Sequence, residues 1–121
     1  MVLGKQVNTS YGTTIDILGL TSDGDVVIVE LKKAKAPREV LTQIFEYLVW
    51  AEKLRYDELN EIAHSKRKLG EGESLMKAFL EYFKGRADAN PEFNAGRRLV
   101  ILTHDFDPKI LDRLSIMEDG V

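Results

Sequence analysis

Residues 13–33, TTIDILGLTSDGDVVIVELKK, decide the fold of this chain. Residues 13–20 are rich in β-branched and apolar side chains, so they predict a strand. Residues 25–33 are almost continuously apolar until Glu30, a pattern that indicates a central strand covered on both faces. Between them, Ser22-Asp23-Gly24 has the composition of a turn in which the glycine can take a positive φ. The stretch therefore predicts a β-hairpin.

The segment that follows the hairpin has the three- and four-residue apolar spacing of an amphipathic helix. Pro37 suits the first turn of this helix, which is expected to extend to about Leu54. A shorter and more polar helix is expected over residues 57–68, and another begins after Ser74, a good N-cap. Three helical segments therefore follow the hairpin in succession.

The last part of the sequence predicts a further strand and a further helix. Residues 98–103, RLVILT, are expected to form a buried strand, and Asp107-Pro108 is expected to open a final helix. At the other end of the chain, residues 2–7 can add an N-terminal strand. Strands that alternate with helical segments in this way predict an α/β layered domain.

Size and composition restrict the class of protein. The 121 residues suffice for one domain with a single core. No apolar run reaches the ~20 residues that span a bilayer, and the N-terminus does not resemble a secretory signal, so no membrane segment is expected. The chain has no cysteine, which excludes disulfides and thiolate chemistry and favours a cytoplasmic location.

The net charge of −3 does not by itself predict a nucleic-acid partner. The basic residues are nevertheless clustered, in Lys32, Lys33, Lys35 and Arg38, in Lys66, Arg67 and Lys68, and in Arg97 and Arg98. Local basic patches on an acidic protein can meet phosphates. The alternative for the second and third clusters is that they are solvated helix faces and loop ends.

Glu30 and Lys32 carry the strongest chemical signal, because they interrupt an apolar strand two positions apart and so share one face. A three-residue loop at 22–24 would pair Thr21 with Asp25, and counting back then places Asp16 opposite Glu30. Opposed side chains have β-carbons roughly 5 Å apart, so these carboxylates repel unless a cation lies between them. A two-residue loop would instead shift the register by one.

Two carboxylates at this position favour Mg²⁺ or Mn²⁺, which prefer hard oxygen ligands. Such a metal can activate water and neutralise charge on a phosphoryl oxygen, while Lys32 could hold the attacking water or the phosphate. Gln43 and Tyr47 lie one turn apart on the following helix, where a glutamine could position water or phosphate. The competing interpretations are a structural Glu–Lys pair at a strand end and, for Gln43, an ordinary boundary residue.

An aspartate in one strand, then Glu-x-Lys at the end of the next, then a helix with glutamine, resembles the PD-(D/E)xK nuclease superfamily. The matching stretches read TTIDILGL, VVIVELKKAKAPREV and LTQIFEY. The sequence is similar in particular to the NucS-like endonuclease branch, which GKQVNTSYGTTIDILGLTSDG and RRLVILTHDFDPKIL also resemble. The resemblance covers nearly the whole chain. It implies an α/β restriction-endonuclease-like three-layer domain with a mixed central β-sheet flanked by helices.

The resemblance also implies roles for individual residues. Asp16 and Glu30 would be metal ligands together with the carbonyl of Leu31, Lys32 the catalytic lysine, and Gln43 a helix-borne accessory residue. Tyr47 matches a recurring aromatic of the branch. Nucleic-acid contacts are expected from a set of four residues, Lys33, Lys35, Arg38 and Tyr47.

Residues 1–121 are thus expected to form a single nuclease-like domain, which hydrolyses phosphodiester bonds in DNA as a Mg²⁺-dependent (or Mn²⁺-dependent) endodeoxyribonuclease. Members of the fold usually begin with a helix that carries an acidic residue into the site, and this chain begins at about the first strand. We therefore expect it to be truncated at both ends relative to its relatives. The alternatives are a non-catalytic nucleic-acid-binding module and a structural homodimerisation module that keeps the fold.

Overall fold

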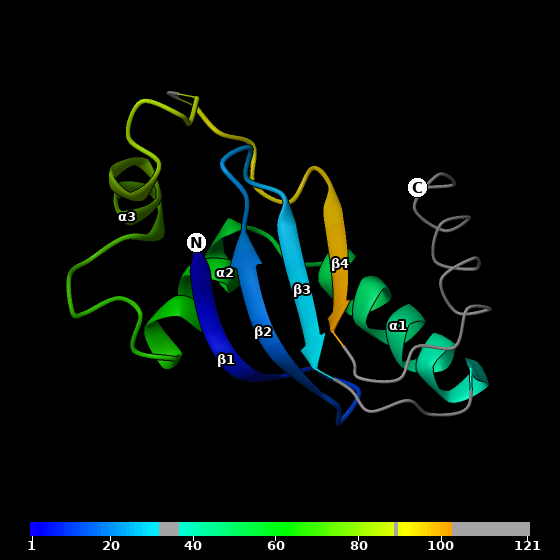
Figure 1. Cartoon of the computed structure of the whole chain (residues 1–121). Helices are drawn as coiled ribbons and strands as arrows, with labels where there is room; N and C mark the ends of the chain where they lie inside the picture. The colour runs from blue at the N-terminus through cyan, green and yellow to red at the C-terminus, as the bar shows by residue number, and fades with distance from the viewer. Residues whose placement is uncertain (32–36, 89, 103–121) are drawn as a thin grey trace.

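The computed structural model describes residues 1–31, 37–88 and 90–102, which form one sheet with helices packed on it (Figure 1). The strands of this part of the chain follow the order β1-β2-β3-β4 across the sheet. β2 is antiparallel to both of its neighbours, β1 and β3, and β4 pairs with β3 in parallel. The elements in chain order are β1 (Val2–Asn8), β2 (Thr14–Leu20), β3 (Val26–Leu31), α1 (Pro37–Glu52), α2 (Tyr56–Ser65), α3 (Leu75–Tyr82) and β4 (Arg97–Leu102).

The predicted hairpin is confirmed, with the three-residue loop that the sequence indicated. The backbone N–H of Thr21 donates to the carbonyl of Asp25 at 3.0 Å, so these two residues close the loop. Gly24 has a φ of 89°, and a β-carbon there would lie 2.6 Å from the carbonyl oxygen of Glu92. Both conditions select glycine. From this turn the ladder continues to the pair Ile17–Val29.

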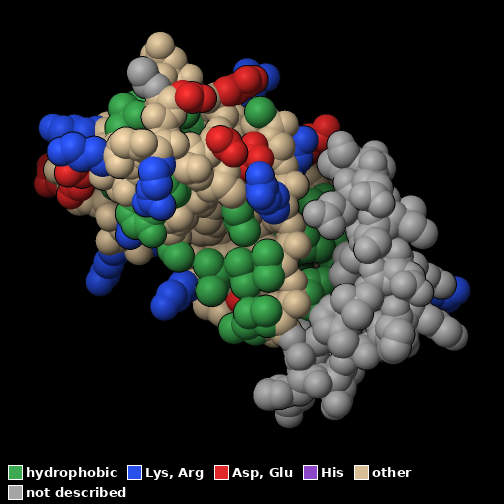
Figure 2. Space-filling view, turned by 45° about the horizontal axis from the view of Figure 1, so that its top comes forward, with side chains coloured by type: hydrophobic (Ala, Val, Ile, Leu, Met, Phe, Trp, Pro, Cys, Tyr) green, Lys and Arg blue, Asp and Glu red, His purple; other side chains and the backbone are tan. Residues whose placement is uncertain are grey.

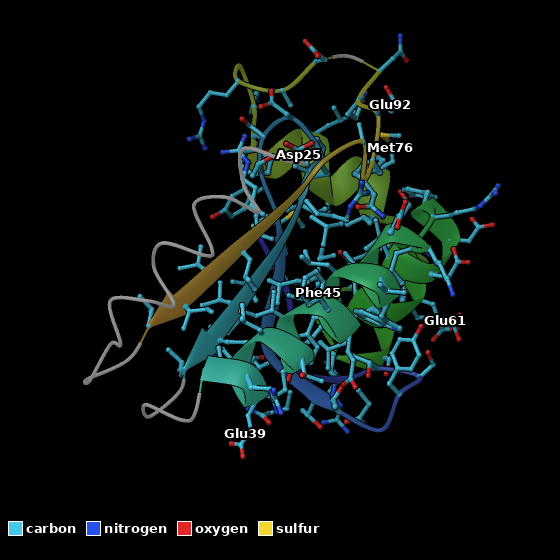
Figure 3. The ribbon with its side chains drawn as sticks, turned by 90° about the vertical axis from the view of Figure 1, so that its right-hand side faces the viewer. Asp25, Glu39, Phe45, Glu61, Met76 and Glu92 are labelled. Carbon is cyan, nitrogen blue, oxygen red and sulfur yellow. The ribbon has the colours of Figure 1, made fainter. Side chains whose placement is uncertain are left out.

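The helices α1 and α2 lie on one side of the sheet (Figure 3), and the main core forms between them and the strands. Val40, Ile44 and Ala51 of α1 are buried as predicted, and a smaller cluster joins the first two to β4. Phe45, which was expected on the same apolar face, is 54% exposed. The N-cap at Ser74 is also confirmed, because its hydroxyl accepts the backbone N–H of Lys77 at 3.2 Å. No helix in the described ranges is both long enough and apolar enough to cross a membrane.

The end of α1 is held by a residue from the loop before β4. Asn94 is buried, and its side-chain amide donates to the carbonyls of Ala51 and Leu54 at 2.7 and 2.8 Å. Its φ of 61° is in the left-handed region, which asparagine tolerates better than most residues. Arg97 donates in turn to the Asn94 carbonyl at 3.1 Å, so the loop links α1 to the start of β4.

Two predictions about burial are wrong. The strand at 98–103 was expected to be buried, but β4 spans Arg97–Leu102 and alternates between half-buried and exposed side chains. The expectation that β3 is covered on both faces holds for one face only, since Val27 and Val29 are half-buried and Leu31 is exposed. The reason in both cases is that α1 and α2 cover a single face of the sheet. The second helix also ends at Ser65, earlier than expected, and the final helix expected at Asp107-Pro108 lies outside the described residues.

Candidate active site

Asp16 and Glu30 are interlocked where the β2–β3 ladder ends. Beyond the pair Ile17–Val29, the backbone N–H of Asp16 donates to Oε1 of Glu30 at 3.0 Å. In the opposite direction, the backbone N–H of Leu31 donates to Oδ2 of Asp16 at 2.7 Å. Each carboxylate thus takes a backbone donor of the other strand. The structure therefore brings the two predicted carboxylates into contact, with the backbone of Leu31 beside them.

The two carboxylates differ in their access to solvent. Glu30 is 2% exposed and Asp16 is half-buried. The side chain of Glu30 lies on the same face as Val26 and Ile28, which belong to the core, so this face changes from apolar to acidic within one strand. Burying a carboxylate is costly unless hydrogen bonds or positive charge compensate it. The buried position of Glu30 therefore favours a cationic partner beside its carboxylate.

Tyr47 connects helix α1 to this corner of the sheet. Its side chain is 1% exposed, and its hydroxyl donates to the carbonyl of Thr14 at 3.2 Å. Burial raises the pKa of Tyr47 to about 12, and the negative charges of Glu30, Asp16 and Glu46, together with a hydrogen bond to Glu30, act in the same direction. Tyr47 is therefore a neutral hydrogen-bond donor beside the carboxylates. Its burial does not support the predicted role in contacting nucleic acid directly.

Gln6 was not singled out from the sequence, yet it contacts the predicted site. Its side-chain amide donates to Oδ1 of Asp16 at 3.2 Å. The flanking pairs Lys5–Ile17 and Val7–Ile15 place Gln6 opposite Asp16 in the β1–β2 ladder. A polar residue in a short N-terminal strand carries no distinctive sequence signal, and only knowledge of the β1 register could have identified it.

The other predicted site residues fall into two groups. Gln43 lies on α1 one turn before Tyr47, is half-buried, and its side chain makes no hydrogen bond within the parts of the chain that the structure describes. Arg38, at the start of α1, is exposed. Three predicted residues, Lys32, Lys33 and Lys35, lie outside the described residues. The structure therefore places Asp16, Glu30, Leu31 and Tyr47 together and leaves the lysines untested.

The basic cluster at Arg97 and Arg98 has a structural explanation. Arg97 donates to the carbonyl and to the side-chain oxygen of Asn94, and Arg98 lies 3.5 Å from Asp25 in an ion pair. In the other cluster, the ammonium group of Lys66 donates to the carbonyl of Gln6 at 2.7 Å. These contacts favour structural roles for Arg97, Arg98 and Lys66 over phosphate binding.

The donor set at the interlock fits a hard divalent cation. Asp16 and Glu30 offer carboxylate oxygens from adjacent strands, which is the chemistry that Mg²⁺ and Mn²⁺ prefer. Residues 1–31, 37–88 and 90–102 contain no group of three or more His, Cys, Asp or Glu side chains that could hold a metal. Among the described residues, the remaining ligands of a metal at this position would be backbone carbonyls and water.

Comparison with known proteins gives a partial likeness to a nuclease. Over 46 residues the chain is 33% identical to a protein named Endonuclease NucS from Sulfolobus acidocaldarius. The matched region makes up 38% of this chain and 18% of that endonuclease, so the chain spans less than a fifth of that relative. No family model matches the sequence, and no solved structure matches the chain significantly. The likeness is therefore to a part of an endonuclease, and the described part of this chain has an α/β fold with a mixed four-stranded sheet.

Proposed function

We propose that this chain is the catalytic domain of a metal-dependent endonuclease with the restriction-endonuclease-like fold, acting on DNA. The observation that carries the proposal is the Asp16–Glu30 interlock at the end of the β2–β3 ladder. A purely structural strand end has no need to bring two carboxylates together, because their repulsion opposes folding. The partial likeness to an endonuclease supports the same conclusion independently.

In this proposal Asp16, Glu30 and the carbonyl of Leu31 hold the metal. The bound Mg²⁺ or Mn²⁺ would supply water activation and neutralise charge that develops on the phosphate. Backbone donors already fix both carboxylates, since Asp16 receives the N–H of Leu31 and Glu30 receives that of Asp16. Ligands held in this way lose little freedom when the metal binds, which favours affinity.

The proposal assigns Lys32 to the attacking water and the scissile phosphate, as a point charge next to the two carboxylates. Gln43 is assigned to positioning, because it lies one turn from Tyr47 on the same helix. Lys33, Lys35 and Arg38 are assigned to contacts with the DNA backbone. Tyr47 is assigned to supporting Glu30 from the core, in place of the predicted contact with nucleic acid.

A thermal melt with and without ~1 mM Mn²⁺ tests the metal site. If the dissociation constant is ~0.1 mM, the metal adds about 1.4 kcal/mol to the free energy of unfolding, a shift of several degrees. Glu30→Gln should lose this shift, and Glu81→Gln, at an exposed position of α3, should keep it. Cleavage of duplex and single-stranded DNA, with a chelator as the control, then tests activity. Equal metal responses in the parent and in Glu30→Gln would refute the site.

Exposed apolar side chains on one face of the described sheet favour a second candidate, a homodimerisation module. On the face turned away from α1 and α2, the paired residues Leu31 and Leu102 are 55% and 54% exposed, and Val100 is 41% exposed. Figure 2 shows hydrophobic side chains gathered on this side of the molecule. Contiguous exposed apolar surface often marks an interface.

Sedimentation of the parent beside Val100→Lys tests this second candidate. A dimer that the lysine dissociates, with no response to Mn²⁺ in either protein, would support a structural module. A third outcome, salt-dependent DNA binding that survives a chelator without cleavage, would indicate a non-catalytic nucleic-acid-binding module.

A further inference from the structure

We propose that Gln6 is a positioning residue for the carboxylate of Asp16 and that Lys66, the C-cap residue of helix α2, holds Gln6 in place. The inference rests on the proposed function, because it assigns Asp16 as a metal ligand. It adds to that function a series of contacts that runs from the C-cap of α2, through strand β1, to Asp16. The residues involved are Lys66, Gly4, Gln6 and Asp16.

The first observation is the backbone of Gln6, which has a φ of 54° within strand β1. This left-handed conformation is unfavourable for a residue with a long side chain and persists only where neighbouring contacts maintain it. Here it accompanies the contact of the Gln6 amide with Oδ1 of Asp16 at 3.2 Å. Because Leu31 donates to the other oxygen, both oxygens of Asp16 have a fixed donor. The carboxylate is therefore oriented from both sides.

The second observation is the contact that maintains this backbone. The Lys66 ammonium group donates to the carbonyl of Gln6 at 2.7 Å, across 60 residues of sequence. A charged donor forms a stronger bond than a neutral one. The carbonyl of Gln6 thus has a partner outside the sheet, which stabilises the unusual conformation of this residue.

The third observation is the path of the Lys66 side chain, which crosses β1 at Gly4. A β-carbon on Gly4 would lie 2.5 Å from Cγ and 2.9 Å from Cβ of Lys66, closer than real β-carbons approach. The absence of a side chain at Gly4 therefore gives Lys66 its path to the Gln6 carbonyl. A β-bulge between Val2 and Gly4 occurs in the same part of the strand. Glycine, lysine and glutamine together form one support for Asp16.

NMR spectroscopy of the metal-free protein tests directly whether Lys66 and Gly4 hold Gln6 in place. In a two-dimensional NMR spectrum, the side-chain amide signals of Gln6 should shift in Lys66→Met and in Gly4→Ala. They should not shift in Lys68→Met, which removes the same charge from the same cluster. Unchanged Gln6 signals in Lys66→Met would overturn the proposed support, whether or not the protein binds metal.

The affinity for Mn²⁺ tests whether the contact of Gln6 with Asp16 contributes to metal binding. Gln6→Met should weaken Mn²⁺ binding by about 10-fold, the lower end for loss of an outer contact to a ligand. Lys66→Met should weaken it by a smaller factor, Lys68→Met should not, and the double variant should match Gln6→Met because the two act in series. Equal affinities in the parent and Gln6→Met would overturn the positioning role and leave the metal site intact. Failure of the parent itself to bind Mn²⁺ would instead refute the proposed function.

Discussion

The backbone amide of Asp16 lies 3.0 Å from Oε1 of Glu30, and the carboxylate of Asp16 accepts the amide of Leu31 at 2.7 Å. Side chains here replace the backbone partners that an antiparallel ladder would otherwise supply. The ladder therefore opens at the point where the acidic residues occur. Within the described residues, this arrangement fixes two carboxylates without a third acidic side chain.

Replacement of Asp16 should separate folding from metal binding. Asp16→Asn keeps an oxygen that can accept the Leu31 N–H, so the metal-free melting temperature should change little. Asp16→Ala removes that acceptor and should lower the free energy of unfolding by about 1–3 kcal/mol. Both should lose the stabilisation by Mn²⁺ in a thermal melt, whereas Asp23→Asn, in the exposed turn, should keep it. A normal shift of the melting temperature by Mn²⁺ in Asp16→Asn would contradict the assignment of Asp16 as a metal ligand.

Removal of the Tyr47 hydroxyl should destabilise the domain. Tyr47→Phe deletes the hydrogen bond to the carbonyl of Thr14 and leaves that part of the core otherwise packed. We expect a loss of about 1 kcal/mol at neutral pH, measured by urea unfolding. The matched control is Tyr82→Phe, at a position 53% exposed, which should change stability little. Equal stabilities of Tyr47→Phe and the parent would show that the hydroxyl contributes nothing.

The same pair of proteins should show a characteristic pH dependence. The folded-state pKa of Tyr47 is raised from 10.0 to about 12, so the unfolded state releases this proton first as the pH rises. The contribution of Tyr47 is therefore complete below pH 10 and is lost as the pH rises towards 12. The stability difference between the parent and Tyr47→Phe should narrow over that range. A difference that stays constant from pH 9 to pH 11.5, or widens, would contradict the raised pKa.

Two phenylalanines allow a matched test of the core. Phe79 on α3 is fully buried and makes edge contacts with Phe83 and Phe93 at centroid distances of 5.0 Å. Phe79→Ala should therefore lower the free energy of unfolding by about 3–5 kcal/mol. Phe45 on α1 is 54% exposed, so Phe45→Ala should cost about 0.5 kcal/mol or less. Denaturant titration of both variants measures the contrast, and similar losses would contradict the assigned burial.

The buried amide of Asn94 should be needed for the junction between α1 and β4. Asn94→Ala removes donors to two helix-terminal carbonyls and puts alanine at a φ of 61°, so it should cost about 2–4 kcal/mol. Asn94→Gly removes the same hydrogen bonds without the backbone conflict and should cost less. The control, Asn90→Ala, alters an exposed loop position and should change the melting temperature little. A larger loss in the glycine variant than in the alanine variant would contradict the role of the left-handed backbone.

The sequence predicted those features that depend on local chemistry. Turn composition at residues 22–24 was enough to predict the hairpin, and Ser74 marked a helix start correctly. The register remained open between a three-residue and a two-residue loop, and the structure has the three-residue loop. The same register brought Asp16 to Glu30. The burial of β4 could not be predicted, because an apolar run does not reveal how many faces of a sheet are covered.

Gln6 escaped prediction for a different reason. Its role depends on a left-handed backbone and on Lys66, a residue 60 positions away, and neither leaves a pattern in the local sequence. Sequence reasoning also assigned Tyr47 to the surface of the site, because helical spacing alone does not distinguish a boundary position from a buried one. The lysine of the Glu-x-Lys motif lies outside the described residues and stays a prediction.

The parallel pairing of β3 with β4 has a consequence for the order of folding. Glu30 and Leu31 pair with Ile101 and Leu102, about 70 residues later in the chain, whereas β1, β2 and β3 pair with their immediate neighbours. A ribosome releases the hairpin with its acidic pair long before it releases the strand that flanks Glu30 on the other side. Because long loops close late, the part of the sheet around Asp16 and Glu30 would reach its final shape only after most of the domain has been synthesised.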